Sequence, residues 1–83
     1  MIWTDPKYTH YLHDVGGVLR DRALDARQRQ RSAARGSHEY EFESGRLMAF
    51  NETIAILQQY AEGFGISTGE LQLQDIEPDR YLV

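Results

Sequence analysis

The sequence predicts an all-α protein: a long antiparallel helical hairpin that pairs with a second copy to form a four-helix bundle. Apolar residues recur at helical spacing over two long blocks, about 6–35 and 38–64, and only Gly36-Ser37 separates the blocks. The second block also carries more apolar surface than one neighbouring helix can cover. At 83 residues the chain is expected to form a single helical domain, 1–83.

The first block has the features of a helix that begins at Asp5-Pro6. Asp is a favoured N-cap, and Pro is favoured at the first helical position. Gly36 can adopt the left-handed conformation that closes many helices, so this helix is expected to end near Arg35. Apolar or small residues follow the helical period at Tyr8, Leu12, Val15, Leu19, Ala23, Ala26 and Ala33.

Gly16-Gly17 interrupts this block, and each glycine costs about 1 kcal/mol relative to alanine inside a helix. Leu12, Val15 and Leu19 nevertheless stay in phase across the pair. We therefore predict one continuous helix, in which the glycines allow either a kink or the close approach of another backbone.

The second block is expected to begin after Ser37 as N-cap, with Glu39 and Glu41 in the first turn, where the helix dipole favours anions. Gly65 followed by Ile66 predicts a Schellman-type end. Apolar residues form a heptad seam, which we expect the hairpin interior to share with a dimer interface. Its members are Tyr40, Leu47, Phe50, Ile54, Leu57, Ala61 and Phe64.

The third block is short. Ser67 and Glu70 have the spacing of a capping box, which predicts a helical turn to about Leu73 followed by an irregular tail. The alternation over 71–74 would also suit a short strand, but only Ile2 and Trp3 could pair with it. The apolar residues of the tail are expected to clamp the end of the bundle.

Composition excludes several classes of protein. The chain has no cysteine, so it offers no disulfide, zinc knuckle or thiol nucleophile. No apolar run approaches the roughly 20 residues of a membrane span, and the N-terminus does not resemble a signal peptide. The net charge of -4 argues against general nucleic-acid binding.

Arginines are concentrated between Arg20 and Arg35, where six of them and two aspartates give a local charge of +4. This segment could follow a phosphate backbone, but it lacks aromatic residues for base stacking and helix-turn-helix spacing. The interpretation we favour is a solvated, partly paired surface. An antiparallel turn would bring Arg27, Arg31 and Arg35 near Glu39, Glu41 and Glu43.

Polar residues of the two blocks match two kinds of enzyme site only in part. His10, His13 and Asp14 share a helix face and could hold a metal, but the second helix offers no histidine beyond His38. The all-α nucleotide pyrophosphatases hold magnesium with paired acidic residues. Here the acidic residues are spaced by two, which spreads them around the helix: Glu39, Glu41 and Glu43. No catalytic residue, metal or cofactor is expected.

Two segments resemble a group of small uncharacterised bacterial proteins. These are FESGRLMAF over 42–50 and LQQYAEGFGI over 57–66, similar to the "GRLMAY" segment and the "QQAEAFGI" helix end of that group. Residues 73–80 are similar to the tail of the same proteins. The resemblance covers the second half of the chain and implies a bacterial cytoplasmic protein, without lending catalytic residues.

The sequence thus favours a non-enzymatic interaction or regulatory module, homodimeric, whose partner is another protein. The alternative is a nucleic-acid-associated accessory protein that uses the basic helix face between Arg20 and Arg35. A small metal- or nucleotide-dependent enzyme is the third interpretation.

Overall fold

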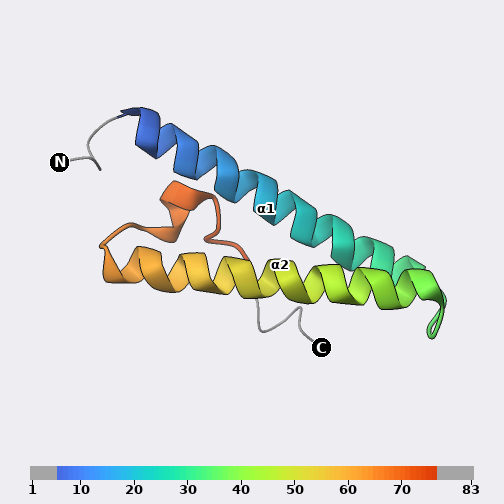
Figure 1. Ribbon diagram of the computed structural model, residues 1–83. Coiled ribbons are helices and arrows are strands. Elements are labelled where there is room, and N and C mark those ends of the chain that lie inside the picture. The colour runs from blue at the N-terminus through green and yellow to red at the C-terminus, as the bar shows by residue number, and fades with distance from the viewer. Residues whose placement is uncertain (1–5, 77–83) are drawn as a thin grey trace.

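The computed structural model describes residues 6–76, and its elements are all helical (Figure 1). Helix α1 spans Pro6–Ser32, helix α2 spans His38–Gly63, and a short 3-10 turn, η2, spans Thr68–Leu71. The two long helices lie antiparallel, which confirms the predicted hairpin. The predicted N-cap Asp5, the strand candidates Ile2 and Trp3, and the tail beyond residue 76 lie outside the described residues.

Helix α1 continues through Gly16-Gly17 without interruption, as predicted. It ends at Ser32, three residues before the predicted end at Arg35. The chain reverses direction over residues 33–37. In this turn the amide of Ser37 donates to the carbonyl of Ala34 at 3.0 Å, and Gly36 takes a φ of +81°. The glycine therefore closes the interhelical turn, outside the helix itself.

Both predicted ends of α2 are confirmed to within one residue. The side chain of Ser37 accepts a hydrogen bond from the amide of Tyr40 at 3.1 Å. At the other end the amide of Ile66 donates to the carbonyl of Ala61 at 2.8 Å, and Gly65, with φ +72°, donates to Glu62 at 3.1 Å. These two bonds define the Schellman motif.

The capping box before η2 is also confirmed. The amide of Glu70 donates to Ser67 Oγ at 3.4 Å, and the amide of Ser67 donates to Glu70 Oε2 at 2.8 Å. The helical turn stops at Leu71, because Gln72 takes the left-handed conformation with φ +58°. The alternative strand over 71–74 is not formed.

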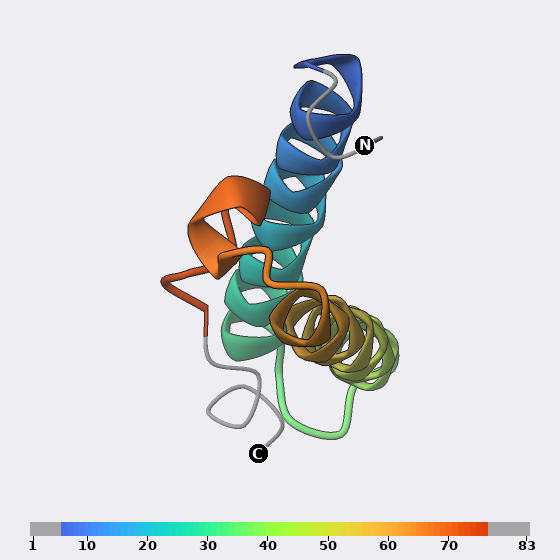
Figure 2. The same cartoon turned by 90° about the vertical axis from the view of Figure 1, so that its left-hand side faces the viewer.

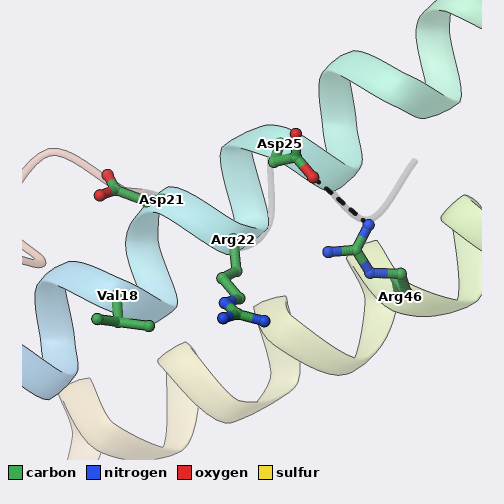
Figure 3. Close-up of a pocket in the computed structure, with 5 residues that line it drawn as sticks. All are labelled: Val18, Asp21, Arg22, Asp25 and Arg46. Carbon is green, nitrogen blue, oxygen red and sulfur yellow. Dashed lines mark ion pairs between the residues drawn. The ribbon is translucent and has the colours of Figure 1, made fainter.

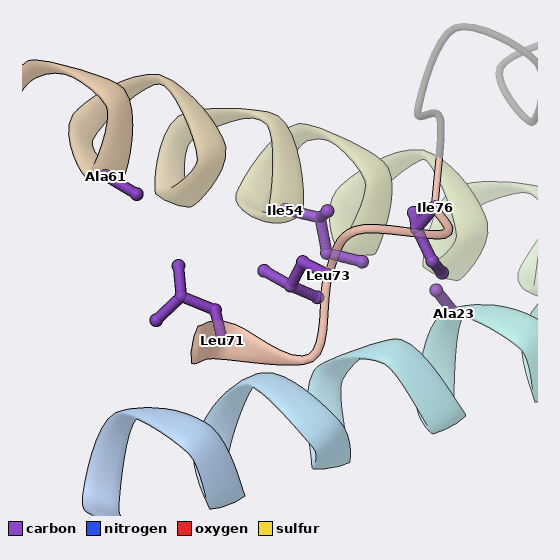
Figure 4. Packing of buried hydrophobic residues seen from close by; sticks show 6 residues of the cluster. All are labelled: Ala23, Ile54, Ala61, Leu71, Leu73 and Ile76. Carbon is purple, nitrogen blue, oxygen red and sulfur yellow. The ribbon is translucent and has the colours of Figure 1, made fainter. Parts of the chain in front are cut away.

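The two long helices converge at their connecting turn and diverge toward the start of α1 (Figures 1 and 2). Residues 66–76, which we call the C-terminal segment, fill the widening space from one side. In Figure 4, Leu71 points toward Ala61, Leu73 lies beside Ile54, and Ile76 approaches Ala23. The C-terminal segment thus supplies three members of the main buried cluster, which consists of Ala23, Ile54, Ala61, Leu71, Leu73 and Ile76.

Polar bonds fix this segment to both helices. From α2, Gln58 Nε2 donates to the carbonyls of Leu73 and Ile76, at 3.0 and 2.9 Å. From α1, Arg20 Nε donates to Asp75 Oδ1 at 2.9 Å. The segment is therefore a third layer of the hairpin, which removes one side of α2 from any contact with a partner.

Candidate interaction surfaces

The predicted heptad seam does not form a single surface. Leu47 and Ile54 are 3% and 0% exposed inside one chain, so neither presents surface to a second copy in this structure. Phe50 and Leu57 are half-buried against the core, and Tyr40 is half-buried near the turn. At the other extreme, Phe64 is 63% exposed. The C-terminal segment causes this division, because it covers only one side of the seam.

Two polar residues that the sequence reasoning missed take part in the buried stripe of α2. Asn51 is 0% exposed, and no residue in the described part of the chain hydrogen-bonds its side-chain amide. Glu43 is also buried, and Arg46 of the same helix donates a hydrogen bond to its carboxylate. Their spacing of four residues on either side of Leu47 was the available signal, since it places all three on one helix face.

Several exposed and half-buried apolar residues instead recur at helical spacing along α1 and α2. In α1 they step by three, four and three residues, and in α2 by seven, three and four, so each set forms one stripe. We call this surface the apolar face. It consists of Tyr8, Tyr11, Val15 and Val18 from α1, and Phe50, Leu57, Tyr60 and Phe64 from α2.

An apolar groove adjoins the α2 stripe, and Ile66 and Leu71 of the C-terminal segment also line it. Its volume is about 150 Å³. Aromatic side chains of α2 form one wall, and Leu12 of α1 contributes to the other. The residues that line it are Leu12, Leu57, Tyr60, Ala61, Phe64, Ile66 and Leu71.

A charged hollow continues the apolar face toward the connecting turn (Figure 3). Arg46 Nη1 lies 3.5 Å from Asp25 Oδ2, and its guanidinium stands 5.6 Å from the centre of the Phe50 ring. Asp25 also accepts a hydrogen bond from Arg29 Nε at 3.2 Å. The lining residues are Val18, Asp21, Arg22, Asp25 and Arg46.

Across the turn, the carboxylates of Glu43 and Glu39 attract Arg29, whereas the prediction named Arg27, Arg31 and Arg35. The hydrogen bond between Arg29 and Asp25 raises the pKa of Arg29 above the ordinary value, and the carboxylates of Glu43 and Glu39 add to the shift. Farther along α1, two open hollows share Arg31: Arg27 lines the first, and Arg35 lines the second together with Tyr40.

The segment FESGRLMAF forms part of the first half of α2, supplying Leu47 to the core and Arg46 to the charged hollow. Comparison of the chain with protein families, curated proteins and solved structures finds no match. The resemblance to small bacterial proteins therefore stays a prediction.

In the predicted histidine cluster, His13 contacts Gln72 of the C-terminal segment. The side-chain amide of Gln72 donates to the carbonyl of His13 at 2.9 Å and lies 3.1 Å from Nδ1 of its ring. Asp14 Oδ1 is 3.5 Å from the same Nδ1. Within residues 6–76, no three metal-binding side chains come together, and neither long helix has the length and hydropathy of a membrane span.

Proposed function

We propose that this chain is a non-enzymatic helical interaction module, which acts as a homodimer and whose ligands are proteins. The apolar face is the observation that supports this proposal. Six of its side chains are between 37% and 66% exposed and lie at helical spacing on the two antiparallel helices. Single exposed hydrophobic residues are common, whereas a contiguous patch of this kind marks a contact surface.

The composition of the face fits a protein partner. Four of the six exposed residues are aromatic: Tyr8, Tyr11, Tyr60 and Phe64. Aromatic residues are enriched at protein–protein interfaces because they bury much apolar area with few rotatable bonds, and a tyrosine keeps a polar tip. A cytoplasmic location, as in the bacterial proteins that the sequence resembles, forms part of the same proposal.

The ionisable groups support the non-enzymatic part of the proposal. Active sites commonly shift pKa values by holding charged groups in a desolvated cleft. In the described part of the chain, the pKa values that depart clearly from their ordinary values are those of Arg29 and Asp75, and both shifts arise mainly from ion pairs at the surface. Such pairs serve structure, since their partners on the chain satisfy them.

Sedimentation velocity over a hundredfold range of protein concentration tests the proposal. We expect a mass of two chains at the higher concentrations, and a thermal midpoint that rises with concentration, because association stabilises the folded state. A single-chain mass at every concentration, with a constant midpoint, would refute the homodimer.

A second candidate function is nucleic-acid binding, favoured by the two adjoining hollows lined by Arg27, Arg31 and Arg35. We expect no affinity tighter than the usual non-specific range, with a Kd of about 10⁻⁴ to 10⁻⁶ M at physiological salt. Titration of labelled duplex and single-stranded DNA at two salt concentrations measures it. A sub-micromolar Kd that is lost in the double variant Arg27→Glu, Arg31→Glu would reverse the ranking.

A further inference from the structure

A homodimer needs a surface other than the predicted seam. Leu47 and Ile54 are 3% and 0% exposed within one chain, and Ile54 packs in one cluster with residues of the C-terminal segment. A second copy could reach these two side chains only by opening that packing. The part of the seam that stays accessible is Phe64, together with the half-buried Phe50 and Leu57. All three belong to the apolar face, which therefore replaces the seam as the candidate surface.

The area of the apolar face is what a small dimer requires. Taking about 200 Å² for a whole aromatic side chain, its exposed residues leave roughly 600 Å² accessible. A standard interface buries about 800 Å² on each partner, part of it in a polar rim. The charged hollow borders the face at Val18 and can supply that rim.

The charges beside the face suit a second copy of the same chain. The hollow contains two acidic and two basic side chains, so it presents no net charge to a symmetric partner. In Figure 3, Arg22 extends into this hollow, and no residue in the described part of the chain pairs with it as an ion pair. A membrane or nucleic-acid surface, in contrast, would call for a single sign of charge.

The groove can hold a side chain. A cavity of about 150 Å³ lined by Leu, Ile and Phe is large enough for benzene, and the groove has the same volume and the same kind of lining. Energetically dominant interface residues are commonly aromatic and fill such central pockets. Tyr60 and Phe64 border the groove from α2, and Tyr11 projects from the facing stripe of α1.

We infer that a second copy of this chain docks on the apolar face, inserts an apolar side chain into the groove, and meets Arg22 with an acidic side chain. This inference rests on the homodimer proposed above. Because the two copies are related by a twofold axis, each contributes the same residues and each groove is filled once. A substitution on either stripe therefore alters two positions of the interface and must weaken the dimer at both.

The test compares two exposed substitutions with a matched control. Tyr60→Glu and Tyr11→Glu alter residues that are each 66% exposed, on the two stripes of the face. Met48→Glu alters an apolar residue of α2 that is 56% exposed and lies away from the face. Because none of the three residues is buried, each variant should keep its helical circular dichroism, and the spectra check this.

Sedimentation equilibrium measures the dissociation constant of each variant. We expect Tyr60→Glu and Tyr11→Glu to raise it at least tenfold, and Met48→Glu to change it less than twofold. Arg22→Glu should raise it several-fold. If both tyrosine variants fold and dimerise as the wild type does, the inference fails while the homodimer stands. A monomeric wild type overturns both, and the face would then belong to the chain's own terminal residues or to a different protein.

Discussion

Gly16 in α1 lies directly against the backbone of Leu71. A Cβ atom built on Gly16 would stand 1.8 Å from the carbonyl oxygen of Leu71, whereas one built on Gly17 meets only the flexible side chain of Gln72. Van der Waals contact forbids the first approach. Gly16 is therefore the position that allows the C-terminal segment to enter the space between the helices.

Gly16→Ala should lower the free energy of unfolding by about 1–3 kcal/mol, because the segment must move or the core must open. Gly45→Ala is the matched control in α2: its Cβ would meet nothing within 4 Å. Alanine should raise stability there by about 0.4–1 kcal/mol, through its higher helix propensity and its less flexible unfolded chain. Urea denaturation of the three proteins measures both. If Gly16→Ala raised the free energy of unfolding as Gly45→Ala does, the close contact between Gly16 and Leu71 would be wrong.

Asn51→Leu should stabilise the protein. The amide is fully buried, and no side chain or backbone group of the described residues bonds it. A buried polar group without a hydrogen bond costs about 1–3 kcal/mol, so an apolar side chain of similar shape should raise the free energy of unfolding by that order. Chemical denaturation measures the change. A loss of stability would show instead that the amide is hydrogen-bonded in solution.

Leu73→Ala should cost about 2–5 kcal/mol, as truncation of a fully buried leucine does. Leu73 is 0% exposed and packs with the core cluster, although it follows the last helical element. Met48→Ala, at a residue 56% exposed, should change stability by less than about 0.5 kcal/mol. Thermal and urea denaturation measure the stability of both variants against that of the wild type. Similar small effects at both positions would mean that the C-terminal segment contributes little to folding.

The ion pair between Arg20 and Asp75 should make the free energy of unfolding depend on pH in the acidic range. The hydrogen bond from Arg20 holds the pKa of Asp75 below its ordinary value of 3.8. A carboxyl group whose pKa is lower in the folded state contributes stability above the unfolded pKa and loses it as pH falls through the folded pKa. The contribution is therefore present at neutral pH and disappears below about pH 4.

Asp75→Asn removes this dependence and should bring the thermal midpoint of the variant closer to that of the wild type in acid than at neutral pH. Arg20 also faces Asp21, whose Oδ1 lies 3.5 Å from Nη1, so Asp21→Asn serves as the comparison. Melting curves at several pH values record the two differences. A gap between wild type and Asp75→Asn that stayed constant into acid would argue against the pair.

Local sequence signals determined the helices, their caps and the turn. Ser37, Gly65 with Ile66, and the pair Ser67 and Glu70 act through bonds between neighbouring residues, so their geometry follows from the local chain alone. The heptad spacing likewise located the apolar residues of α2. These patterns gave the all-helical hairpin and a continuous α1.

The tertiary structure alone decided which apolar residues are buried and which remain as a surface. Periodicity shows that Leu47, Ile54, Tyr60 and Phe64 lie along one broad stripe, but it does not show which side another segment covers. The C-terminal segment enters beside Gly16 and packs against Ile54, while Tyr60 and Phe64 remain exposed. That division depends on contacts between residues more than fifty positions apart, such as Arg20 with Asp75, which no local pattern encodes.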